Sequence, residues 1–222
     1  MTIKPLLFYM RAADYPEIEQ ELKKIPCDKF ITNYMPYPFP HDLAREFFLE
    51  HTEYDYLIVQ PQDLLFTKSD FEKLMLELNK NDFDVLSCVC NVERMGHPNH
   101  FKMAICKKIP SLDRLRRVYN WIPNGDLGII EIEFQGMVCA AIHRRIIQRK
   151  TIDGEWFFKG TVHKGTGQFL AAPDLTFAHV CKNNGIKQYA DTRIKLIHYA
   201  NHKPNLVGIK EASTTFIKFD DK

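Results

Sequence analysis

Two polar residues, each at the end of an apolar run, could together hold one divalent cation. Asp63 closes the motif "QPQD" after the run "YDYLIV", and His198 closes the alternating run "RIKLIH". In an open α/β sheet, ligands bind where loops converge at the carboxyl ends of the strands. A carboxylate there is an oxygen ligand for Mg²⁺ or Mn²⁺, and an imidazole nitrogen shifts the preference towards Mn²⁺. Because such a cation would neutralise a diphosphate, the two residues predict a metal site for a phosphorylated ligand.

The first half of the chain alternates apolar strands with amphipathic helices. Strands are expected at residues 6–10, 27–34, 54–60 and 83–90, and helices at 15–25, 41–51 and 67–81. Ser69 followed by Glu72 predicts a capping box in the last of these helices. This order predicts an α/β fold in a single domain: a Rossmann-like mixed, mostly parallel sheet flanked by helices.

The second half of the chain is more mixed. The pattern predicts a helix at 112–121, a strand at 128–136, a strand that ends on His198 and an edge strand in the final stretch, 210–222. Asp174 is expected as the N-cap of another helix and Gly185 as its C-terminal stop. The glycine-bearing segment 153–169 is expected to form a mobile lid, with Trp156 offering a face on which a sugar could stack.

Composition excludes several classes of protein. The chain has 222 residues and a formal net charge of +2, so no overall basic field suggests nucleic acid as a partner. No apolar segment approaches the roughly 20 residues of a membrane span, and no secretory leader pattern is visible. The six cysteines are scattered without metal-site spacing, which favours buried, reduced thiols. A cytoplasmic protein is therefore expected, while the oligomeric state is left open.

Three blocks, in order, resemble glycosyltransferases of the A-type fold, the nucleotide-diphospho-sugar transferase class, and family 2 in particular. "YLIVQPQDLLFTKSDFEKL" stands where the class has a strand, a D-x-D metal motif and a capped helix, and "EFQGMVCAAIHRR" resembles the strand end that faces the donor sugar. "APDLTFAHVCKNNGIKQYADTRIKLIH" resembles the block of acid, helix, glycine, strand and histidine, and is the most specific. The first carboxylate of D-x-D is replaced by Pro61.

The resemblance implies a transfer of a sugar from a nucleoside-diphosphate-sugar donor to an acceptor that is a glycan, a protein or a small molecule. Asp63 would bind the Mn²⁺ or Mg²⁺ that bridges the donor diphosphate, and His198 would complete the metal shell. Asp174 would face the acceptor hydroxyl, as general base in an inverting reaction or as orienting carboxylate in a retaining one. The other implied contacts are to the donor: Gln60 to the nucleotide, Gln62 near its ribose or phosphate, Gln135 and Gly136 beside its sugar, and Arg94 near a phosphate. Residues 1–95 would form the nucleotide-binding half, 96–200 the donor-sugar and acceptor half, and 201–222 an extension.

Other interpretations of the same residues stay open at this point. Taken singly, Asp174 could be only a helix cap, Asp63 only a turn residue and His198 only a packed histidine. The two glutamines could satisfy backbone groups instead of a nucleotide. A non-catalytic sugar-nucleotide or glycan-binding module would fit the altered metal motif. A nucleotidylyltransferase fits less well, because "YMRAADYP" after the first strand lacks a glycine-rich phosphate loop.

Overall fold

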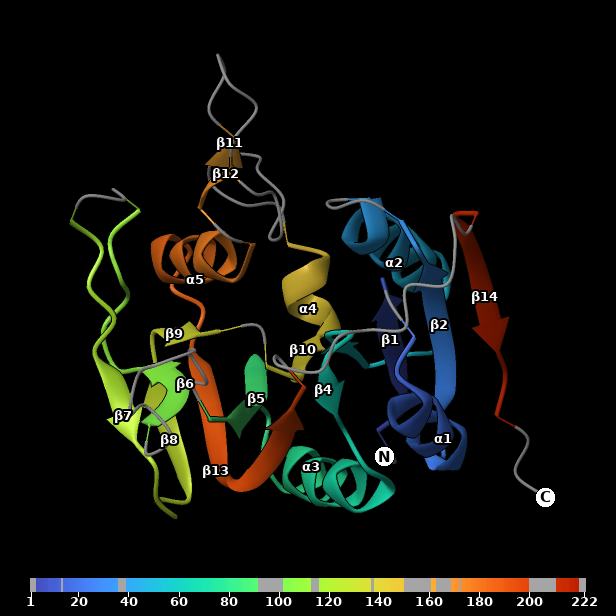
Figure 1. The fold of residues 1–222 in the computed structure, drawn as a ribbon, viewed down its shortest axis with the longest axis horizontal. Coiled ribbons are helices and arrows are strands. Elements are labelled where there is room, and N and C mark those ends of the chain that lie inside the picture. The colour runs from blue at the N-terminus through green and yellow to red at the C-terminus, as the bar shows by residue number, and fades with distance from the viewer. Residues whose placement is uncertain are drawn as a thin grey trace.

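The fold is a mixed β-sheet covered by helices on both faces (Figure 1). The structure, a computed structural model, describes residues 3–12, 14–35, 39–91, 102–112, 116–136, 138–149, 161–162, 169–171, 173–199 and 211–219. The helices are α1 (Pro16–Lys24), α2 (Phe39–Glu50), α3 (Lys68–Lys80), α4 (Arg144–Ile147) and α5 (Pro173–Asn183). The strands of the main sheet are β1 (Pro5–Arg11), β2 (Asp28–Asn33), β3 (Tyr56–Gln60), β4 (Leu64–Leu65), β5 (Val85–Cys90), β8 (Ile129–Ile132), β10 (Ala140–His143), β13 (Gln188–His198) and β14 (Ser213–Ile217).

The strand order of the main sheet is β14-β2-β1-β3-β10-β5-β13-β4, and β8 also pairs with β13. Strands β2, β1, β3, β5 and β13 run in one direction, while β14, β10, β8 and β4 run in the other. The predicted mixed sheet flanked by helices is therefore confirmed, but the sheet is not mostly parallel: among its described strands, three pairings are parallel and five are antiparallel. Because β10 runs antiparallel between β3 and β5, the carboxyl ends of the strands on either side of it still open on the same edge of the sheet.

Two small sheets stand beside the main one. The first has the order β7-β6-β9, from β6 (Lys102–Cys106), β7 (Trp121–Pro123) and β9 (Phe134–Gln135). The second is the pair β11 (Thr161–Val162) and β12 (Phe169–Ala171). Helix α5 packs against the three-stranded sheet through a cluster that contains Phe134, Leu175 and Ala178.

Alternate side chains of the strands enter two separate hydrophobic cores. On one face, Leu7 and Ile58 of the sheet pack with residues of α1 and α3 such as Ile18 and Leu74. On the other face, α2, α4 and α5 contribute Phe48, Ile146 and Phe177, among others. Burial on both faces explains why the central strands are apolar along their whole length. Figure 1 shows α1 and α3 below the sheet and α2, α4 and α5 above it.

The first half of the chain agrees closely with the sequence-based prediction. All four predicted strands and all three predicted helices of residues 6–90 are present within a few residues of their expected ends. The predicted capping box at Ser69 and Glu72 is wrong, because Thr67 is the N-cap of α3 and exchanges hydrogen bonds with Asp70. Thr67 and Asp70 satisfy the same three-residue spacing two positions earlier, so sequence alone does not choose between the two pairs.

Three expectations for the second half are wrong. The described residues of 112–121 form no α-helix; Arg117 instead donates to the carbonyls of Ser111 and Leu112, and β7 begins at Trp121. The single strand predicted at 128–136 is two strands, β8 and β9, which belong to different sheets. Asp174 lies inside the first turn of α5, which begins at Pro173, and so is not its N-cap.

Other expectations are confirmed. Gly185 ends α5 in the left-handed region, with a φ of 65°, and β14 forms an edge strand next to β2. All six cysteines are buried free thiols. Among the described residues, no helix is both long and apolar enough to cross a membrane.

Arg144, the first residue of α4, makes hydrogen bonds to backbone carbonyls at and just after the C-terminal end of α2. Its guanidinium donates to the carbonyl oxygens of Phe48, His51 and Tyr54 at 2.5–2.7 Å and lies 4.1 Å from the centre of the Phe48 ring. The last carbonyls of a helix have no partner inside that helix, so a cation placed there satisfies them and also favours the helix dipole.

We expect Arg144→Ala to lower the free energy of unfolding by about 2–4 kcal/mol, because three charge-assisted hydrogen bonds are lost at once. Urea unfolding followed by circular dichroism measures this change. Arg149→Ala is the matched control, because Arg149 is exposed, and it should change stability by no more than about 0.5 kcal/mol. Equal effects of the two variants would contradict the role assigned to Arg144.

Candidate functional site

Asp63 lies on a tight turn that follows β3. Gln60, the last residue of that strand, donates from Nε2 to the carbonyl of Leu64 at 3.0 Å and closes the turn around Pro61, Gln62 and Asp63. The next two residues form β4, which runs antiparallel to the end of β13. The polar motif at the end of a buried strand is thus a turn that presents one carboxylate at the edge of the sheet.

The pairing of β4 with β13 brings His198 to Asp63. Leu64 is the register partner of His198, and Tyr199 donates its backbone N–H to the carbonyl of Asp63 at 2.8 Å. As a result, Nε2 of His198 lies 3.2 Å from Oδ2 of Asp63. The two residues that the sequence singled out, 135 positions apart, are therefore in direct contact.

The geometry of this pair fits a shared divalent cation. Two ligand atoms on adjacent positions of an octahedral ion, each at about 2.1 Å, lie roughly 3 Å apart, which is close to the observed separation. Both side chains keep access to solvent, with 31% of Asp63 and 25% of His198 exposed. Within the described ranges, no group of three or more His, Cys, Asp or Glu residues could hold a metal. The other coordination positions of the ion would be filled by phosphate oxygens of the bound molecule and by water.

A cavity of about 270 Å³ opens next to the pair. It lies at the carboxyl ends of β1, β2 and β3, and its polar lining comes from Arg11, Thr32, Gln62 and Asp63. Its volume is near the lower limit of typical small-molecule sites. Arg11 and Thr32 were not identified from the sequence, although the rule that loops at strand ends bind ligands could have identified both.

Asp174 lines a second cavity, of only about 10 Å³, which has room for about one water molecule. Its lining includes Gln135 and Asp174 on one side and Val59 and Pro61 on the other. Gly136 stands beside the carboxylate: a Cβ placed on this glycine would lie 3.9 Å from Oδ2 of Asp174. Pro61 lines both cavities, so Asp174 and Asp63 belong to cavities that share this one residue.

Burial raises the pKa of the Asp174 carboxyl from its ordinary 3.8 to about 6. A hydrogen bond from the backbone N–H of Leu175, at 2.8 Å, and the positive charge of Arg117 oppose this shift without cancelling it. A carboxylate with this pKa is ionised at neutral pH and is a stronger base than an ordinary aspartate.

The three glutamines of the site differ in their surroundings: one pairs with a backbone group, and two line the cavities where a bound molecule would lie. Gln60 is fully buried, and its amide nitrogen satisfies a backbone carbonyl. Gln62 and Gln135 instead line the two cavities. In all three side chains, Oε1 is buried and accepts no hydrogen bond from the described part of the chain. Buried side-chain oxygens without a protein partner are uncommon in folded proteins.

Two expected parts of the site lie outside the described residues. These are Arg94 and most of the glycine-bearing segment 153–169, including Trp156. The candidate site therefore consists here of Asp63 and His198 with Gln62 beside the first cavity, and of Asp174 with Gln135 beside the second.

Comparisons with known proteins support the fold alone. The sequence matches no protein-family model and no curated protein. Among solved structures, the chain is similar to the crystal structure of A197 from STIV, with a TM-score of 0.56 and 16% sequence identity. The match covers 94% of this chain and 99% of that one. Two chains this different in sequence share an architecture, and a shared architecture does not establish a shared activity.

We expect Asp174→Asn to stabilise the protein at high pH. A raised pKa in the folded state means that folding opposes ionisation, so stability is lost as pH rises from about 4 through about 6. The amide cannot ionise, so the variant should gain about 1–3 kcal/mol over the wild type near pH 8 and nothing near pH 4. Urea unfolding across this range measures the difference. The exposed control Glu72→Gln should show no such trend, and a gain for Asp174→Asn that is independent of pH would contradict the assigned pKa.

Proposed function

We propose that this protein is a metal-dependent glycosyltransferase that moves a sugar from a nucleoside-diphosphate-sugar donor to a hydroxyl acceptor. The observation that carries the proposal is the 3.2 Å contact between Asp63 and His198 at the carboxyl edge of the sheet. It is supported by the cavity next to the pair and by Asp174, which lines a second cavity that shares Pro61 with the first. Because all six cysteines are free thiols, we place the reaction in the reducing cytoplasm.

The proposed reaction breaks one bond and forms another. The acceptor oxygen bonds to the anomeric carbon, the bond from this carbon to the diphosphate oxygen breaks, and the nucleoside diphosphate leaves with the electron pair. Mn²⁺ or Mg²⁺, when bound, would offset the negative charge that grows on the leaving diphosphate. Asp63 and His198 are the residues that would hold this ion, and the cavity lined by Arg11 and Gln62 would hold the nucleotide.

Asp174 would act on the acceptor. In an inverting reaction its carboxylate takes the proton of the attacking hydroxyl, and a pKa of about 6 suits this role near neutral pH. In a retaining reaction it orients the acceptor by a hydrogen bond. Gln135 lines the same small cavity as Asp174, and Gly136 lies beside the carboxylate, so both would border the donor sugar if this cavity widens when the donor binds.

A non-catalytic binding module is the second candidate, because one observation favours it. Pro61 occupies the place of the first acidic residue of D-x-D, so Asp63 is the only carboxylate of this turn. A cation held by one carboxylate and one imidazole binds less tightly than one with a further acidic ligand. Such a site could retain a sugar nucleotide without turnover.

We expect a nucleoside diphosphate with Mn²⁺ to raise the melting temperature, measured by differential scanning fluorimetry. Ligand at 100 times its Kd contributes about 2.7 kcal/mol, which corresponds to a rise of about 5 °C or more for a chain of this size. Asp63→Ala should abolish the rise, because it removes one of the two protein ligands. The exposed control Glu72→Ala should keep it. A rise that persists in Asp63→Ala would exclude Asp63 from the metal site.

We also expect slow release of nucleoside diphosphate from at least one member of a panel of UDP, GDP and dTDP sugars, measured by a coupled assay. Water replaces the missing acceptor in this assay, so no acceptor has to be known. Asp174→Asn should keep the thermal stabilisation by nucleotide but lower turnover about 100-fold or more if Asp174 is the general base. Binding of a donor without turnover by the wild type would favour the non-catalytic module.

A further inference from the structure

Strand β13 carries His198 and changes its neighbours halfway along its length. Its first half pairs with β8, from Gln188 to Asp191, and its last two residues pair with β4. On the other side, β13 pairs with β5 at residues 188–190 and 195–196, and the register shifts between Ala190 and Lys195. Residues 191–194 stand opposite Cys88 alone, so β13 contains three extra residues in a bulge. Bulges bend the strand that contains them and increase its twist.

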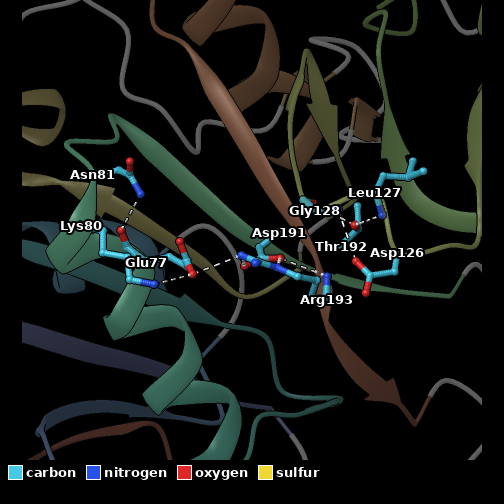
Figure 2. A network of polar contacts seen from close by, with 9 residues as sticks. All are labelled: Glu77, Lys80, Asn81, Asp126, Leu127, Gly128, Asp191, Thr192 and Arg193. Atoms are coloured by element: carbon cyan, nitrogen blue, oxygen red, sulfur yellow. Dashed lines mark hydrogen bonds and ion pairs between the residues drawn. The ribbon is translucent and has the colours of Figure 1, made fainter.

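A bidentate ion pair between two side chains stabilises this bulge (Figure 2). The carboxylate of Asp191, which is 1% exposed, accepts hydrogen bonds from Nε and Nη2 of Arg193 at 2.8 and 2.7 Å. It also accepts one from the backbone N–H of Arg193 at 3.0 Å. The guanidinium extends to Glu77 of α3 at 3.2 Å. A buried carboxylate is costly without its partners, so the bulge cannot rearrange freely.

Thr192, the second residue of the bulge, makes hydrogen bonds on the opposite side of β13. The fully buried hydroxyl of Thr192 accepts a hydrogen bond from the N–H of Leu127 at 2.8 Å and donates to the carbonyl of Gly128 at 2.9 Å. The backbone N–H of Thr192 donates to the same carbonyl at 3.0 Å. The bend is therefore held from two directions, by α3 and by the loop before β8, as Figure 2 shows.

A small rotation at this bulge would separate the metal pair. His198 is five residues beyond Arg193, which is about 16 Å along a strand. Over that distance, a rotation of about 10° displaces the end of the strand by roughly 3 Å, as much as the whole separation of Asp63 and His198. Beyond the bulge, β13 pairs with β5 at Lys195 and Leu196 and with the short strand β4 at Ile197 and His198. Because these pairings are short, the direction of this part of β13 depends on the bend at the bulge.

We propose that Arg193, through its contacts with Asp191 and Glu77, is a positioning residue that aims His198 at Asp63. This inference rests on the proposed function in so far as the pair binds a metal. Arg193 itself contacts neither the cavity nor the proposed ligand. It lies at the start of the second half of β13, whereas His198 lies at the end of the strand. Its role would be to keep the two ligands at a separation suited to one ion.

The first test measures Mn²⁺ affinity by electron paramagnetic resonance of the full chain. We expect Arg193→Ala to weaken binding about 10-fold or more, the range seen when residues that support metal ligands are replaced. Glu77→Gln keeps the pair of Asp191 and Arg193 and weakens the ion pairs of Glu77 with Arg193 and Lys80. It should give a smaller loss and covers the case in which Arg193→Ala does not fold. The matched control is Lys187→Ala. Lys187 is also an exposed cation that pairs with a carboxylate, that of Glu131 at 3.9 Å. The Mn²⁺ affinity of this variant should stay within about twofold of wild type.

The second test needs no metal and separates this inference from the proposed function. In the wild type, Asp63→Asn should shift the ring signals of His198 in a carbon–proton correlation spectrum, because the two side chains are in contact. In the Arg193→Ala or Glu77→Gln background, the same substitution should shift them much less. An equal shift in both backgrounds would overturn the positioning role. A wild type that binds no Mn²⁺ but shows the expected spectra would overturn the metal site and leave the positioning role in place.

Discussion

The candidate site depends on a two-residue antiparallel contact between β4 and the end of β13. This contact joins the turn after β3 to a segment 135 residues further along the chain. The two register pairs of β4 with β13 fix the position of His198 along the strand relative to Asp63. The hydrogen bond from the backbone N–H of Tyr199 to the carbonyl of Asp63 adds a third constraint. Other parts of the sheet serve to hold these strands: β5 guides β13 on its long side, and β1 holds β3 in the centre.

The two carboxylates of the site have different surroundings, and this difference suits two different tasks. Asp63 lies on a partly exposed turn, where an ionised carboxylate can meet a cation and phosphates at little cost in hydration. Asp174 lies against apolar side chains such as Val59 and Phe177, and burial there raises its pKa. One environment favours holding a charge and the other favours exchanging a proton, a division that is common in enzymes with two acidic groups.

Local sequence patterns were sufficient for much of this protein, and the failures have physical causes. The strands and helices of the first half follow from hydrophobic periodicity, because both faces of the sheet are covered and most apolar positions are buried. Residues 112–121 have a helical pattern, but the aromatic rings of Tyr119 and Trp121 stack on each other, 4.7 Å apart, and pack onto Phe134 instead. Tertiary packing of this kind is not visible in a window of ten residues. For the same reason, the sequence indicated Asp63 and His198 but could not reveal the bulge of β13, whose partners come from α3 and the loop before β8.

The edge strand β14 has a consequence for handling the protein. It covers β2, whose six residues are all buried, and is held there by side-chain bonds from Asn33 to Ser213 and Thr215 and by the Phe219 N–H bonded to Asp28. Without this cover, β2 would present an open row of backbone donors and acceptors that recruits strands from other chains. Fusion tags or truncations that loosen residues 213–219 would therefore favour aggregation. Low solubility of such variants would say nothing about Asp63 and His198, because these residues belong to other strands of the sheet.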